Sequence, residues 1–284
     1  LPARFLVLGS ASPDLIKQGS ESLAGRISYH ELPSLSLMET RRVDRGKLWL
    51  RGGFPRSYLA ASEAMSLDWR RDMVKTYLER ELPGLDFRVP AATMRRFWAM
   101  LAHYHGQVWN GSEFARSFGV SDKTVRGYLD ILSDTFMVRL LRPWHENLSK
   151  RQVKSPKLYF RDSGILHLLC GIENAAQLQT HPRCGASWEG FALEQTIQMV
   201  GAREEECYFW ATHQEAELDL LWVRGAKRMG FEFKSSRSPG LTLSMRVAMK
   251  DLGLDHLWVV HSGSKSYSLE KNISAVPLMR ISGF

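Results

Sequence analysis

The sequence lacks the patterns that mark membrane proteins, disulfide-stabilised proteins and zinc ribbons. No apolar run in its 284 residues approaches the ~20 residues that a membrane-spanning helix needs. The three cysteines, Cys170, Cys184 and Cys207, stand far apart and form no C-x-x-C pair. That spacing argues against a zinc ribbon or a disulfide scaffold and favours a reducing compartment. We therefore expect a cytoplasmic protein that does not act at a membrane.

A phosphate-binding loop is also missing. No G-x-x-x-x-G-K-[ST] motif occurs in the chain, and the stretch 263–266 has the ending of that motif without its first glycine. Because such a loop wraps the phosphates of ATP, binding of ATP by this chain alone should be negligible. The sequence begins with Leu1 rather than Met and enters an apolar stretch almost at once. We expect it to start inside a longer protein.

Basic side chains outnumber acidic ones. The 38 lysines and arginines and 30 aspartates and glutamates give a formal net charge of +8. An excess of this sign favours an anionic partner, with nucleic acid as the first choice. The hydrophobic fraction of 44% and the charged fraction of 24% are ordinary for a soluble globular protein.

Part of the positive charge is concentrated between residues 139 and 161. One interpretation is a surface that follows a phosphate backbone, and the other is a solvated linker. Within this stretch, Lys150, Arg151 and Lys154 are our candidate nucleic-acid contacts. The basic residues of the stretch are Arg139, Arg142, Lys150, Arg151, Lys154, Lys157 and Arg161.

A helix-turn-helix pattern precedes this basic stretch. Residues 112–118 and 122–132 have helical spacing, the turn 119–121 separates them, and 135–141 reads as a strand. This order predicts a winged helix. If it binds nucleic acid, Lys123, Thr124 and Arg126 would face the groove and the phosphates. The alternative is a winged helix that serves only as a packing module.

Acidic residues recur on two neighbouring predicted strands, 217–223 and 230–234, which a short loop joins. Alternation places Asp219 on one face of the first strand, and Glu232 and Lys234 together on one face of the second. Carboxylates gathered on a sheet repel one another unless a cation lies among them, so the pattern predicts a metal site. The alternative is an ion pair between Glu232 and Lys234 beside a solvated Asp219.

The flanking elements give this motif a context. A helix over 186–200 and a strand over 207–210 precede it, and a helix over 241–252 and a strand over 256–261 follow it. With Asp219 followed by Glu232-Phe233-Lys234, this order resembles the restriction-endonuclease-like PD-(D/E)xK superfamily. The resemblance implies that Asp219, Glu232 and Glu189 hold Mg²⁺ and that Lys234 serves the water that attacks a phosphodiester. Many members keep the fold without the reaction, so an inert binding module is the alternative.

The whole chain resembles the C-terminal part of a prokaryotic AAA-type ATPase that ends in a winged helix and a nuclease-like domain of unknown function. The resemblance implies a multidomain α/β fold with the end of a P-loop core at 1–33, a helical lid at 34–90, the winged helix at 91–150 and the nuclease-like domain at 151–284. The stretches that carry it are 5–12, 23–26, 52–56, 77–82, 159–164, 188–189, 217–219 and 232–235.

Three further roles follow from that resemblance alone. Ser10 and Ser12 would lie near the γ-phosphate of a nucleotide, and Arg26 falls where such ATPases place an arginine finger. The ATPase core could also support self-association. ATP would be a cofactor only of a full-length protein that has a P-loop.

Overall fold

The computed structural model describes residues 9, 28, 30–40, 44–85, 87–146, 152–213 and 216–281. The nucleotide-site candidates Ser10, Ser12 and Arg26 lie outside the described residues, as do Lys150 and Arg151 of the basic stretch. Nearly all of the segment expected to be the end of an ATPase core lies outside them too, so these expectations stay predictions.

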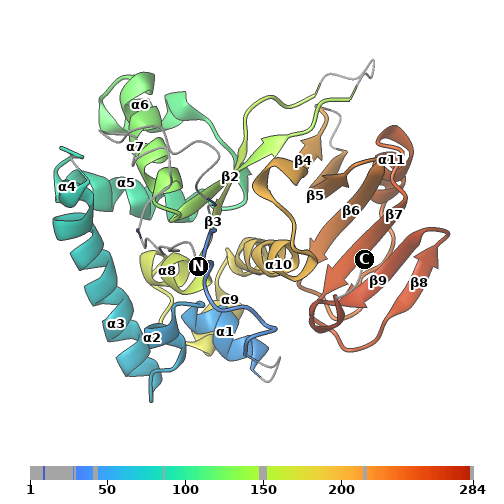
Figure 1. Cartoon of the computed structure of the whole chain (residues 1–284), viewed down its shortest axis with the longest axis horizontal. Coiled ribbons are helices and arrows are strands. Elements are labelled where there is room, and N and C mark those ends of the chain that lie inside the picture. The colour runs from blue at the N-terminus through green and yellow to red at the C-terminus, as the bar shows by residue number, and fades with distance from the viewer. Residues whose placement is uncertain are drawn as a thin grey trace, which may run out of the picture.

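Between residues 45 and 103 the described chain contains only helices and the loops that join them (Figure 1). A continuous rod runs from α3 through a π-helical turn into α4, and it begins where Ser62 caps the first turn by accepting the N–H of Met65. The rod ends at Pro83-Gly84, two residues that break helices. The helices are α1 (Arg45–Arg51), α2 (Pro55–Tyr58), α3 (Glu63–Thr76), the π-helical turn (Tyr77–Glu81), α4 (Leu82–Gly84) and α5 (Ala91–His103).

The next elements are a pair of helices flanked by short strands. The short strand β1 follows α5, the helices α6 and α7 come next, and the hairpin of β2 and β3 completes the unit in the sheet order β1-β3-β2. Ser121 caps α7 by accepting the N–H of Thr124. The bounds are β1 (Gln107–Val108), α6 (Gly111–Phe118), α7 (Asp122–Asp134), β2 (Val138–Pro143) and β3 (Lys157–Phe160).

The remaining elements contain the predicted order of helix, three strands, helix and strand, formed by α10, β4, β5, β6, α11 and β7. Gly225, with a φ of 60°, makes the two-residue turn between β5 and β6. Two strands that the sequence did not predict, β8 and β9, follow. The bounds are α8 (Ser163–Leu169), α9 (Ala175–Thr180), α10 (Cys184–Val200), β4 (Cys207–Ala211), β5 (Glu217–Arg224), β6 (Lys227–Lys234), α11 (Leu243–Asp251), β7 (His256–His261), β8 (Tyr267–Glu270) and β9 (Ile273–Pro277).

One mixed sheet runs through both halves of the described chain, in the order β1-β3-β2-β4-β5-β6-β7-β9-β8. Strand β2 pairs with β3 on one side and, in parallel, with β4 on the other, where Arg142 faces Tyr208 and Pro143 faces Phe209. The hairpin therefore connects the part of the chain that contains α6 and α7 to the C-terminal sheet, as the middle of Figure 1 shows. The chain is a mixed α/β protein, which confirms the predicted class at this level.

Two helices cover opposite faces of the C-terminal sheet. Trp188 and Phe191 of α10 share an apolar core with Phe231 and Phe233 of β6. On the other face, α11 packs against β5 and β7 through a second core that contains Met245. Burial of these large side chains stabilises each layer by roughly 1.5–3 kcal/mol per residue. Among the described residues, no helix is both long and apolar enough to cross a bilayer.

Two glycine-containing stretches that lie far apart in the sequence, 52–56 and 159–164, meet where α1 ends and α8 begins. Asp162 caps α8 through the N–H of Ile165 at 2.9 Å, and its second oxygen accepts the N–H of Gly53 at 2.8 Å. Gly164 lies directly against the backbone of Arg51, where no side chain could fit. These contacts hold the start of α8 against the end of α1. Both stretches therefore have a structural role in the packing of the two helices.

Candidate functional site

The two acidic strands separate where the predicted site lies. Backbone pairing between β5 and β6 ends at Leu220 and Phe231. Beyond that pair, Asp219 and Glu232 bridge the strands with their side chains. Asp219 Oδ2 accepts the N–H of Phe233 at 2.9 Å, and Glu232 Oε2 accepts the N–H of Asp219 at 3.3 Å. Both carboxylates are buried there, with 6% and 5% of each residue exposed.

The other two predicted residues join this pair. Lys234 Nζ lies 3.1 Å from Glu232 Oε1. Glu189, from the second turn of α10, reaches the same place and accepts a hydrogen bond from the Tyr159 hydroxyl at 2.5 Å. The structure therefore brings Glu189, Asp219, Glu232 and Lys234 together, on three elements that surround one spot.

A fifth residue, which the sequence did not single out, lies among these carboxylates. Lys157, the first residue of β3, has its ammonium 3.5 Å from Glu189 Oε1 and 3.8 Å from Asp219 Oδ1. It also forms a close ion pair with Glu217. The signal that could have found it is the alternation in 157–160, which places Lys157 on the same face as Tyr159, the residue that contacts Glu189.

The basic stretch between 139 and 161 is therefore neither uniformly a phosphate surface nor a solvated linker. Lys157 is buried in the acidic cluster, and Arg139 is buried in a two-bond ion pair with Glu194 of α10, at 2.5 and 3.0 Å. Arg161 lies 3.9 Å from Glu194 and also pairs with Glu31. Their charges are paired with carboxylates inside the protein because the β2–β3 hairpin is packed against α10.

Burial and mutual repulsion shape the electrostatics of the cluster. Burial, with the nearby charge of Asp219, raises the pKa of Glu189 to about 7 and that of Glu232 to about 8. Burial alone would lower the pKa of Lys157, but Tyr159 and the surrounding carboxylates outweigh it and raise that pKa well above its usual value. The cluster thus keeps its lysines charged and limits the negative charge that it carries at neutral pH.

Magnesium does not fit this arrangement as the side chains stand. Asp219, Glu189 and Glu217 face the Lys157 ammonium, and Glu232 faces Lys234. Within the described ranges, no three histidine, cysteine, aspartate or glutamate side chains come close enough to share a metal ion. The carboxylate oxygens that Mg²⁺ would need are engaged by ammonium and backbone N–H groups. The Mg²⁺ site stays a prediction.

The predicted nucleic-acid contacts that the structure describes, Lys123, Thr124, Arg126 and Lys154, lie outside the acidic cluster. Lys123 and Arg126 are exposed on the first turns of α7, and Arg126 pairs with Asp130 of the same helix at 2.9 Å. The Thr124 hydroxyl is 2.9 Å from that of Ser121. Lys154 is exposed just before β3. These residues are not brought to the acidic cluster.

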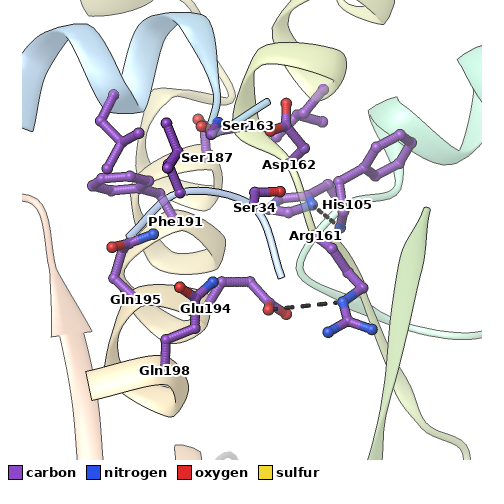
Figure 2. Close-up of a pocket in the computed structure, with 15 residues that line it drawn as sticks. Ser34, His105, Arg161, Asp162, Ser163, Ser187, Phe191, Glu194, Gln195 and Gln198 are labelled. Carbon is purple, nitrogen blue, oxygen red and sulfur yellow. Dashed lines mark hydrogen bonds and ion pairs between the residues drawn. The ribbon is translucent and has the colours of Figure 1, made fainter. Parts of the chain in front are cut away.

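A small cavity lies where the segment 34–37 crosses α10, and Figure 2 shows its lining. Arg161 and Asp162 approach it from the end of β3, and Ser187, Glu194 and Gln195 from α10. Its volume of about 10 Å³ corresponds to roughly one water molecule. It belongs to the packing between the two halves and has no room for a substrate.

Comparison with known families divides the chain into two parts. Residues 43–176 match the family model described as domain of unknown function DUF8612, and residues 184–281 match that of domain of unknown function DUF4143. The chain contains a DUF8612 domain followed by a DUF4143 domain. The DUF8612 match covers helices α1 to α8, the start of α9, strands β1 to β3 and Lys157, whereas Glu189, Asp219, Glu232 and Lys234 lie in the DUF4143 match. The acidic cluster is therefore shared between the two domains.

Two mycobacterial proteins are homologous to the chain over almost its whole length. They are "Uncharacterized protein Rv2008c" of Mycobacterium tuberculosis and "Uncharacterized protein Mb2031c" of Mycobacterium bovis. Each is 48% identical over 281 residues, which cover 99% of this chain and 63% of the relative. The chain thus spans less than two thirds of the length of these relatives. No solved structure matches it.

Proposed function

We propose that this chain is the C-terminal part of a prokaryotic AAA-type ATP-binding protein and that it contacts nucleic acid through its winged helix. The motifs of such ATPases and the net charge of +8 support this proposal. A P-loop would have to lie outside this chain. The DUF4143 domain would be restriction-endonuclease-like in fold, and in its present arrangement it would act as a binding module.

The observation that carries this proposal is the exposed start of α7. In a winged helix that binds DNA, the N-terminal turns of the second helix of the helix-turn-helix enter the major groove. Here those turns present Lys123 and Arg126 to solvent. The exposed ion pair between Arg126 and Asp130 is worth at most about 1 kcal/mol, so a phosphate could take the place of the carboxylate at little cost.

Replacing Lys123 with alanine should weaken binding of duplex DNA at every sequence tested. One lost phosphate contact lowers the slope of log affinity against log salt by about 1. Fluorescence anisotropy at several salt concentrations measures both quantities. Lys250→Ala is a matched control, because Lys250 is an exposed helical lysine at the far C-terminal part of the chain.

Three results would contradict DNA contact through α7. They are an affinity that does not respond to salt, an equal loss in the Lys123 and Lys250 variants, and no binding by the wild-type chain. Lys154→Ala extends the test to the segment before β3. A duplex RNA of the same sequence distinguishes the two nucleic acids.

A second candidate function is hydrolysis of phosphodiesters by the nuclease-like domain. The convergence of Asp219, Glu232, Glu189 and Lys234 on one spot favours it, because these are the residues that the superfamily would use. It requires the cluster to rearrange away from the ion pairs described above.

A plasmid assay tests hydrolysis directly. If these residues act in catalysis, the wild-type chain with Mg²⁺ cuts plasmid DNA, and Asp219→Ala and Lys234→Ala each lose that activity. Equal activity in all three proteins, or equal inactivity, removes this candidate. The DNA-binding proposal is untouched by either outcome.

A further inference from the structure

We infer that Lys157 takes the place of a divalent cation in the acidic cluster, so that the wild-type protein keeps metal ions out of its nuclease-like site. This inference rests on the nuclease-like fold proposed above and is independent of DNA contact. It accounts for the disagreement between the predicted Mg²⁺ site and the arrangement that the side chains adopt.

The first argument is the position of the ammonium. Lys157 Nζ lies within 4 Å of oxygens from three different carboxylates, those of Glu189, Glu217 and Asp219. Only 6% of the lysine side chain is exposed. A charge placed this far from water is retained only where opposite charges surround it. Lys157 therefore neutralises the charge of these carboxylates, as a bound cation would.

The second argument is competition for the same oxygens. The remaining carboxylate, Glu232, gives one oxygen to Lys234 and the other to the N–H of Asp219. Asp219 gives one oxygen to the N–H of Phe233, and its other oxygen faces Lys157. A divalent ion would have to displace an ammonium from the cluster or be held beside it. A divalent ion bound to these oxygens would lie next to the Lys157 ammonium. Two neighbouring cations in a buried site repel each other strongly, so metal and Lys157 exclude one another.

The third argument is that the lysine cannot easily leave. Lys157 is held by its backbone in the middle strand of the winged-helix sheet, where it faces Val108 on β1 and Leu141 on β2. Its side chain would have to abandon a buried position to make room. The DUF8612 domain thus supplies the charge that the acidic residues of the DUF4143 domain lack.

Lys157→Met tests the inference, because methionine keeps most of the unbranched apolar side chain and removes the charged end. We expect the wild-type chain to bind no Mn²⁺ and to have the same Tm in EDTA and in excess Mn²⁺. We expect Lys157→Met to bind Mn²⁺, measured by electron paramagnetic resonance. Its Tm should rise by roughly 5 °C when Mn²⁺ is about a hundredfold above Kd.

Two further variants separate metal binding from general destabilisation. Lys157→Met with Asp219→Asn should lose the Mn²⁺ signal, since it removes a ligand. Lys157→Met with Glu217→Gln removes one charge of each sign and keeps Glu189, Asp219 and Glu232, so it should fold without metal and still bind the ion. Circular dichroism checks that each variant is folded.

Three outcomes would overturn the inference. The wild-type chain could bind Mn²⁺ in a way that Asp219→Asn abolishes, which would make Lys157 a displaceable neighbour. Lys157→Met and Lys157→Met with Glu217→Gln could fold and yet show no response to Mn²⁺. Finally, if neither Lys157→Met nor Lys157→Met with Glu217→Gln folds even with Mn²⁺ present, the ion cannot replace the positive charge of the lysine. None of these measurements involves DNA, so failure here and failure of the DNA-binding proposal are distinguishable.

Discussion

Replacing Gly164 with alanine is expected to destabilise the protein by about 3 kcal/mol, at the upper end of the range for overpacked cores. A Cβ atom at this position would stand 2.1 Å from the carbonyl oxygen of Arg51 and 2.4 Å from its carbonyl carbon. Both are backbone atoms, so no side-chain rotation relieves the contact. Either α1 or α8 must move, and the Asp162 hydrogen bond to Gly53 would be strained with it. Urea unfolding measures the loss.

Gly127→Ala is the matched control for that experiment. Gly127 also lies inside a helix, α7, but nothing stands within 4 Å of where its Cβ would be. Alanine should therefore stabilise this helix by about 0.5–1 kcal/mol, since glycine has the poorer helix propensity. If both alanine variants changed stability by the same amount and in the same direction, close packing of Gly164 on Arg51 would not be the cause.

Glu194→Ala should cost about 3–5 kcal/mol, because it leaves Arg139 charged and buried without its partner. Only 5% of the Glu194 side chain and 7% of the Arg139 side chain are exposed. Calorimetry or urea unfolding at neutral pH gives the loss. The double variant Arg139→Met with Glu194→Leu removes both charges and should recover most of it. No recovery in the double variant would show that the ion pair is not the source of the effect.

The same ion pair predicts a pH dependence. Burial raises the pKa of Glu194, but Arg139 beside it outweighs burial, and the net pKa lies below its usual value. A lowered pKa contributes stability that is complete above the unfolded pKa of about 4.3 and is lost as the pH falls through the folded value. The stability difference between wild type and Glu194→Gln should therefore shrink in acid. A difference that grew as the pH fell would contradict this assignment.

Much of the C-terminal fold could be predicted because its elements carry their own patterns. Strand alternation over 217–223 and 230–234 places Asp219, Glu232 and Lys234 correctly, and helical spacing marks α10 and α11. Strands β8 and β9 escaped prediction, although they are no shorter than the strand predicted over 207–210. Strand β9 is moreover defined by parallel pairing with β7, which local sequence does not show.

The cluster itself could be predicted only in part. Glu189 entered through a family resemblance, and its place beside Asp219 depends on how α10 packs on the sheet. Lys157 was missed because it precedes Glu217, its close partner, by 60 residues. It reaches Glu217 only because β2 pairs with β4. Local patterns report which side of a strand a residue occupies, but a contact between distant strands depends on the tertiary fold.

The pairing of β2 with β4 has a practical consequence for anyone who divides the chain at the family boundaries. A cut between residues 176 and 184 separates these two strands. Strand β4, Cys207–Ala211, then becomes an exposed edge strand of the C-terminal fragment. The unpaired backbone N–H and C=O groups of an edge strand can pair with other polypeptides, which promotes aggregation. The fragment would also contain Glu189, Glu217 and Asp219 without the lysine that neutralises them. Polypeptides that span both regions are therefore the suitable material for biochemistry.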